Sequence, residues 1–146
     1  MKYLKDELYD ACDIEDEDSM ERWSEAFACY EKEFSQVRHR FPKRFLAEVD
    51  QGYGICDRAV RRIVIEEKKP NHFDLTLQLG KPEYNTIVLQ NISALQINQV
   101  INQIWIHHEF LPIENGRISL EVAFWGGGRL YVEFKSLCFF RDKPHE

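Results

Sequence analysis

The first third of the chain carries apolar residues at helical spacing. They recur every three or four positions between residues 20 and 41, which predicts one amphipathic helix of about twenty residues. Asp18, with Glu21 three positions later, resembles a capping box and marks the expected start. The aromatic stripe is wide, so we expect this helix to lie against a large apolar surface. The apolar positions are Met20, Trp23, Phe27, Tyr30, Phe34, Val37 and Phe41.

Two shorter helices are expected on either side of it. Leu4 to Cys12 has a helical pattern and is followed by the acidic loop Asp13 to Asp18. Pro42 suits the first turn of a helix, which predicts a third helix from Lys43 to Val49.

From Val60 onward the spacing of apolar residues changes to two, which indicates strands. Pro70-Asn71 marks a turn between two antiparallel strands, and Thr86 to Ile92 forms a third with Ile87 and Leu89 on one face. Residues 93–103 are rich in Asn and Gln, and either a short helix or an irregular crossing fits them.

Three closing strands are joined by two glycine-containing turns. Ile113 to Arg117 suits a three-residue hairpin loop with Gly116 in the left-handed conformation. This register places Phe110 opposite Leu120 and avoids burying a carboxylate. Around Gly126 to Gly128 we expect a second hairpin in which Phe124 lies opposite Leu130.

The same register gathers acidic and aromatic side chains on the opposite face of the three strands, because side chains alternate along a strand. Three glutamates that recur every twelve residues form one expected row across it. Either this face is solvated or partly covered by the helices, or it has a function. The candidate residues are Trp105, His107, Glu109, Glu121, Trp125, Tyr131 and Glu133.

Two functions fit such a face. Trp and Tyr are enriched where proteins bind one another, and carboxylates attract a basic partner, so the first hypothesis is a noncatalytic protein-binding surface. The second is a small metal-dependent hydrolase in which His107 and the three glutamates hold a divalent cation. If the helices cover the face, we expect homodimerisation instead.

Charge and composition bear on the kind of partner, the cellular location and the state of the cysteines. The net charge is −6, and residues 1–33 alone hold 12 acidic against 4 basic side chains. An acidic chain is a poor match for nucleic acid, which needs a clustered basic surface. No apolar run is long enough to span a membrane and no secretory signal is recognised, so a cytoplasmic location is expected. The four cysteines are scattered without metal-site spacing and are expected to be buried free thiols.

The common catalytic signatures are missing from the sequence. It contains neither a nucleophile elbow nor a P-loop, and Cys56 has no histidine beside it in the sequence. No cofactor is therefore expected.

Several segments together resemble an uncharacterised family of bacterial cytoplasmic proteins. They are Met1 to Tyr9, Cys56 to Val60, Ile104 to Phe110, Ile118 to Phe124 and Leu130 to Phe134. The family's layout is similar to that of small immunity proteins that protect bacteria from toxins, so the resemblance implies a protein partner. Where that family often has His-Asp before the first strand, this chain has Cys56-Asp57.

Taken together, these patterns predict an α+β fold. Two or three N-terminal helices, within residues 1–50, are expected to pack on a mainly antiparallel sheet of about six strands within residues 55–142, ending in a three-stranded meander. The 146 residues are expected to form a single domain, residues 1–146.

Overall fold

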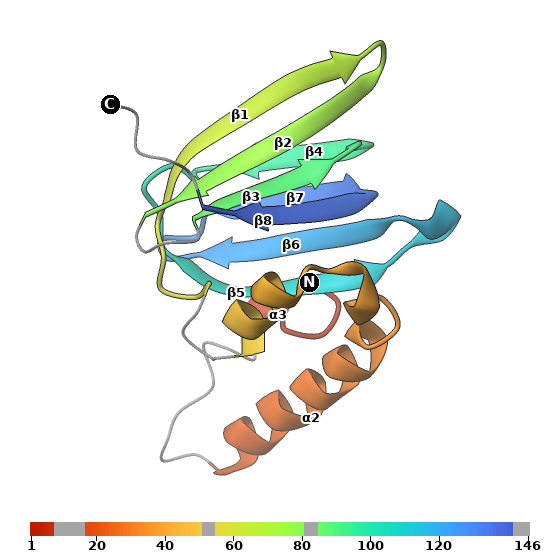
Figure 1. Cartoon of the computed structure of the whole chain (residues 1–146). Helices are drawn as coiled ribbons and strands as arrows, with labels where there is room; N and C mark the ends of the chain where they lie inside the picture. Colours follow the sequence, from red (N-terminus) through yellow and green to blue (C-terminus); the bar gives the residue numbers. More distant parts are fainter. Residues whose placement is uncertain (8–16, 51–54, 81–84, 142–146) are drawn as a thin grey trace.

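In the computed structural model, two antiparallel sheets of four strands face one another, and the helices lie along one side of them (Figure 1). The structure describes residues 1–7, 17–50, 55–80 and 85–141. The α+β class is confirmed. The expected single sheet of about six strands is wrong, because eight strands divide equally between two sheets.

The first sheet has the strand order β1-β2-β3-β8. Its strands are β1 (Val60–Lys69), β2 (His72–Leu79), β3 (Thr86–Gln90) and β8 (Ser136–Phe140). The turn at Pro70-Asn71 is confirmed, with Asn71 in the left-handed region at φ 62°. As predicted, Ile87 and Leu89 are both buried.

The second sheet has the order β4-β7-β6-β5. Its strands are β4 (Ala94–Asn98), β5 (Trp105–Pro112), β6 (Ile118–Phe124) and β7 (Arg129–Phe134). Strand β4 falls in the segment where we expected a helix or an irregular crossing, so that prediction is wrong. Its Asn and Gln side chains are tolerated because β4 is an edge strand that is exposed along much of its length.

The first closing hairpin has the predicted register and the second does not. Phe110 lies opposite Leu120, and the Ile113 N–H donates to the Arg117 carbonyl oxygen at 3.0 Å, as a three-residue loop requires. In the second hairpin, however, Leu130 pairs with Val122, two residues from the expected Phe124.

Gly128 lets the second hairpin lie close to the end of β4. A Cβ atom on Gly128 would lie 2.0 Å from the carbonyl oxygen of Gln99, so only glycine lets the hairpin approach the end of β4 this closely. The shift of two residues keeps the same side chains on the inner face, since the side-chain period of a strand is two.

The core fills the space between the sheets. Apolar side chains alternate along every central strand, so each strand contributes one face to it. The innermost side chains include Leu75, Leu77, Ile87, Leu89, Phe110, Leu120, Val122, Leu130, Val132 and Phe134.

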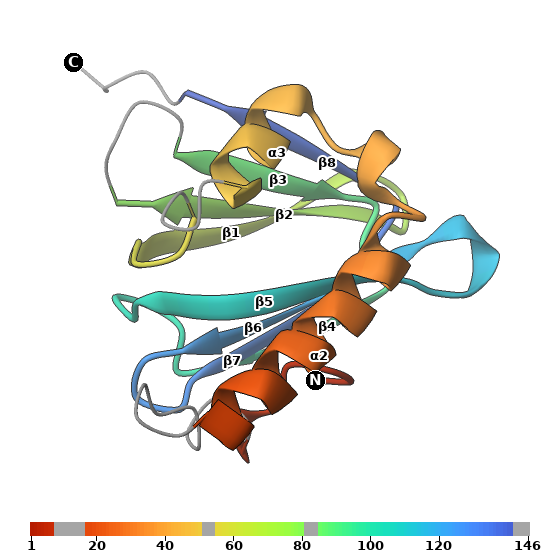
Figure 2. The same cartoon turned by 90° about the horizontal axis from the view of Figure 1, so that it is seen from below.

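Helix α3 (Lys43–Asp50) closes one open side of the sandwich (Figure 2). Its Phe45 is fully buried, and the ring centroid lies 5.7 Å from that of Phe110 on β5 and 5.4 Å from that of Phe139 on β8. One aromatic residue therefore joins the edge strands of both sheets. The predicted helix from Lys43 to Val49 is confirmed.

Helix α2 (Glu17–Phe34) crosses the outside of the second sheet near β5. It is shorter than predicted: after Phe34 the chain turns into a 3₁₀ helix at Arg38–Arg40, and Val37 is buried outside α2. Asp18 lies within the first turn, so it is not the residue preceding the helix. The apolar stripe is only partly buried, because Met20 and Phe27 are exposed.

The first expected helix begins later than predicted. Residues 6 and 7 are helical, whereas Leu4 is not, and the rest of the predicted range, from residue 8 to Cys12, lies outside the described residues. None of the helices that the structure describes is long and apolar enough to cross a membrane.

Candidate functional site

The outer face of the second sheet holds five of the seven predicted site residues: Trp125 lies in the turn that follows β6, and Trp105 points into the core. A β-bulge between Trp105 and His107 turns the indole into the core, where it is fully buried. The prediction for Trp105 is wrong because a bulge reverses the alternation of side chains beyond it.

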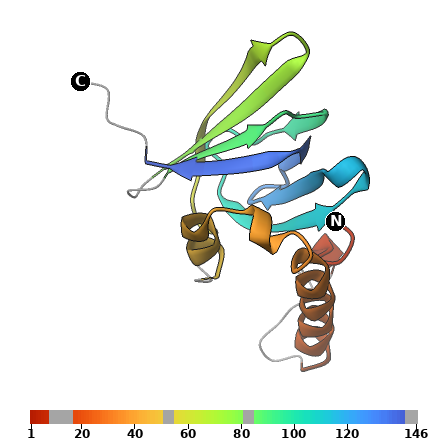
Figure 3. The ribbon, with the colours of Figure 1, turned by 45° about the vertical axis from the view of Figure 1, so that its right-hand side comes forward.

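Glu109 faces outward as expected but is covered by the chain's own N-terminal segment, whose backbone runs close to the sheet in Figure 3. Its side chain is 1% exposed and accepts backbone N–H bonds from Lys2 at 3.0 Å, Tyr3 at 2.8 Å and Leu4. A carboxylate that accepts several N–H groups is stabilised in its charged form without a cation. Glu109 therefore anchors residues 2 to 4 across β5.

The expected row of three glutamates is only partly formed. Glu121 lies opposite Glu109, as predicted, and its Oε1 is 3.1 Å from the Met1 α-amino nitrogen. The next position in the row is Tyr131, whereas Glu133 lies opposite Ser119, one row away. The Tyr131 hydroxyl donates to Glu133 at 2.7 Å. The two-residue shift of the second hairpin causes this displacement.

His107 is also covered. Its Nε2 lies 3.2 Å from the Leu4 carbonyl oxygen, and the ring of Trp23 on α2 meets it edge-on at 5.6 Å. Within the described parts of the chain, no three or more His, Cys, Asp or Glu side chains are grouped to hold a metal ion. The predicted cluster of His107 with three glutamates is thus not formed there.

Trp125 is the predicted site residue that remains most accessible, at 65% exposure. Its backbone N–H donates to the Ile104 carbonyl oxygen at 2.8 Å, which places it directly opposite Ile104, itself 42% exposed. A hollow beside Trp125 is lined by Ala123 and by an ion pair between Asp6 and Arg129. We call this region, with Ile104, Trp125 and the half-exposed Tyr131, Glu121 and Glu133, the Trp125 surface.

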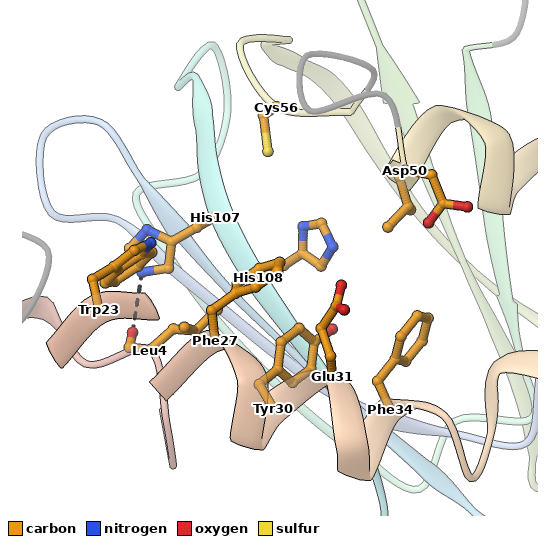
Figure 4. A pocket seen from close by; sticks show the side chains of 11 residues that line it. Leu4, Trp23, Phe27, Tyr30, Glu31, Phe34, Asp50, Cys56, His107 and His108 are labelled. Atoms are coloured by element: carbon orange, nitrogen blue, oxygen red, sulfur yellow. Dashed lines mark hydrogen bonds between the residues drawn. The ribbon is translucent and has the colours of Figure 1, made fainter. Parts of the chain in front are cut away.

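A second concave region lies between α2 and the free edge of β5 (Figure 4). It has a volume of about 280 Å³, and we call it the His108 pocket. Aromatic residues of α2 form one wall and β5 forms the other. The lining residues are Leu4, Trp23, Phe27, Tyr30, Glu31, Phe34, Val49, Asp50, Cys56, His107 and His108.

His108 is a buried histidine on β5, opposite Val122 and two positions before Phe110. The Trp105 indole N–H donates to its Nδ1 at 2.9 Å. Burial, with a smaller contribution from the nearby His107, lowers the pKa of His108 to about 4. The ring is therefore neutral at neutral pH.

Cys56 lines the same pocket, although no histidine is near it in the sequence. Burial, with a smaller contribution from Asp57, raises the pKa of its thiol to about 11. Nucleophilic catalysis by cysteine needs a thiolate, which a neighbouring imidazolium commonly stabilises. Here the thiol stays protonated and the imidazole neutral, so the pocket is suited to binding rather than thiol chemistry.

Comparison of the chain with protein-family models, with curated proteins and with solved structures found no match. The resemblance to an uncharacterised bacterial family thus stays a prediction, and the functional argument depends on the residues themselves.

Proposed function

We propose that this chain is a noncatalytic, cytoplasmic protein-binding domain, and that the Trp125 surface is its docking site for a basic protein. The observation that carries the proposal is the exposure of Trp125, which lies in the turn after β6 and is hydrogen-bonded to Ile104, the residue before β5. Large exposed aromatic residues supply much of the binding energy in protein interfaces, and burying an exposed tryptophan removes a large apolar area from water.

The shape of this surface supports insertion of a partner side chain. The hollow beside Trp125 is lined by Ile106 and Ala123 at its apolar side and by Asp6 and Arg129 at its polar side. A partner can place an apolar group against the indole while its backbone or polar groups meet the Asp6–Arg129 ion pair. Apolar centres with polar rims are typical of protein interfaces.

Charge supports a basic partner. The chain carries a net charge of −6, and Glu121 and Glu133 are half-exposed on the same sheet face. Complementary charge mainly accelerates association and selects among partners. Given the resemblance to immunity proteins, a basic toxin domain is the first partner to test.

The test compares three variants in photo-crosslinking and affinity capture. Trp125→Ala removes the proposed anchor, Glu133→Lys reverses a rim charge, and Phe140→Ala is the control. Phe140 is 43% exposed but lies on β8 in the other sheet. We expect the partner of the wild type to be lost with Trp125→Ala, weakened with Glu133→Lys and retained with Phe140→Ala.

Two outcomes contradict the proposal. Equal recovery of the partner by all three variants rejects the Trp125 surface as the docking site. Sedimentation equilibrium that shows a dimer dissociated by Trp125→Ala assigns this surface to self-association instead.

A further inference from the structure

We propose that the His108 pocket is a binding site for a small, uncharged ring molecule that carries a carbonyl group next to an N–H. The site lies at the edge of β5, under α2, and among the described lining residues it shares only His107 with the hollow beside Trp125. The proposal starts from the hydrogen bonds of His108.

The contact with Trp105 fixes which nitrogen of His108 carries the proton. An indole N–H can only donate, so Nδ1 of His108 must accept, and in a neutral imidazole the proton is then on Nε2. His108 is 9% exposed, and Figure 4 shows its ring standing in the pocket between Cys56 and Glu31. Within the described residues, the Trp105 bond is the only hydrogen bond to this ring.

Among the residues that the structure describes, no hydrogen bond joins Nε2 of His108 to Glu31 or Asp50, the two carboxylates that line the pocket. A ligand carbonyl placed in the pocket can accept from this N–H. The Nε2–H of His108 is therefore the first polar contact of the site.

The free edge of β5 supplies two more contacts. The Phe110 N–H points away from β6 and donates to the Tyr30 hydroxyl at 3.0 Å. In an antiparallel strand, residues two apart direct their N–H and C=O groups to the same edge, so His108 presents its backbone N–H and C=O toward the same side as Phe110. This edge, lined by Tyr30 and His108, borders the pocket.

The size and polarity of the site define the ligand. A cavity of about 280 Å³ walled by Trp23, Phe27 and Phe34 fits one or two rings. Glu31 and Asp50 also line it, and Asp50 is already paired with Arg38. The Glu31 carboxylate disfavours an anion, and a neutral His108 adds no positive charge beside it. A carbonyl accepts from His108, while an adjacent N–H donates to the backbone carbonyl of the edge.

Benzamide is the smallest convenient probe of this chemistry, because it joins a ring to a carbonyl and an N–H. Benzoate has the same shape with a negative charge, and toluene lacks the polar groups. For a ligand of this size we expect a Kd on the order of 1 mM for benzamide, and binding weaker by about tenfold for both comparators.

The readout is the nitrogen spectrum of the histidine rings together with the Trp105 indole N–H resonance. We expect benzamide to shift the Nε2 resonance of His108 most and the Trp105 indole resonance less. Phe27→Ala removes a pocket wall and should weaken binding by about tenfold. Met20→Ala is the matched control, because Met20 lies on the same helix with 44% exposure, against 42% for Phe27, and does not line the pocket.

Three results overturn the proposal. They are an unchanged His108 resonance with benzamide at about 10 mM, an equal response to benzoate, and equal binding by Phe27→Ala and Met20→Ala. Trp125→Ala should leave benzamide binding unchanged. If benzamide does not bind, the proposed protein-binding function is unaffected, and if no protein binds the Trp125 surface, the proposed ligand site is unaffected.

Discussion

Replacing His108 by glutamine should flatten the dependence of the protein's stability on pH between 7 and 5. His108 is buried, its Nδ1 accepts the Trp105 indole N–H, and its pKa falls from the ordinary 6.5 to about 4. The glutamine carbonyl oxygen can accept the same indole N–H, but the amide does not titrate. The variant therefore removes the proton equilibrium and preserves an acceptor for Trp105.

The direction of the effect follows from proton binding in the two states. Between pH 6.5 and 4 the unfolded chain protonates this histidine and the folded protein does not, so acid favours unfolding. The contribution of neutral His108 to the free energy of unfolding is fully present above the pKa that this histidine has in the unfolded chain. It is lost progressively as the pH falls toward 4. The two pKa values give a loss of about 2 kcal/mol between pH 7 and pH 5.

Urea unfolding of the wild type and His108→Gln at several pH values measures this difference. Contributions from the remaining groups near the pocket, including Glu31, Asp50 and His107, are shared by both proteins and largely cancel in the comparison. We expect the free energy of unfolding of the wild type to fall by about 2 kcal/mol more than that of the variant over this range. Parallel curves, or a His108 ring resonance that titrates near pH 6.5, would refute the reasoning.

Two further predictions concern stability and are measured by urea unfolding at pH 7. Glu109→Gln should lower the free energy of unfolding by about 3 kcal/mol, because its amide group would face backbone N–H donors that the buried carboxylate now satisfies. Glu133→Gln is the control and should change the free energy of unfolding by less than about 0.5 kcal/mol. Similar losses in the two variants would show that Glu109 does not anchor the N-terminal segment. Gly128→Ala should cost about 3 kcal/mol, because its Cβ would overlap the Gln99 carbonyl, while Gly127→Ala, with open space but φ +89°, should cost about 1 kcal/mol. A reversed order would refute the steric role of Gly128.

Sequence patterns predicted the structure correctly where it depends on the alternation of side chains along a strand or on a residue typical of turns. Pro70-Asn71 and the three-residue loop between Ile113 and Arg117 were identified as turns from their residue types, and Phe110 was paired correctly with Leu120. Helix α3 was predicted from Pro42, which suits the first turn of a helix. Each of these features depends on neighbours in the sequence, which is why the sequence was sufficient.

The arrangement of the candidate site depends on contacts between residues that are far apart in the sequence. A bulge turned Trp105 inward, and the two-residue shift of the second hairpin moved Glu133 out of the glutamate row. Neither effect has a signal in hydrophobic spacing, because both arise from contacts between distant segments. The His108 pocket was missed for the same reason: Cys56, His108 and the aromatic residues of α2 meet only after folding.

The sequence by itself determined which residues form strands in the two hairpins and which face of each strand is apolar. It also determined that acidic and aromatic side chains share the opposite face, because the alternation of side chains follows from the backbone alone. Only the tertiary structure decided that the strands divide into two sheets, that residues 2 to 4 cover Glu109, and that Trp125 stays exposed while His108 is enclosed. These outcomes depend on which surfaces come into contact, and hydrophobic burial is not directional, so the one-dimensional pattern is compatible with several arrangements of the same faces.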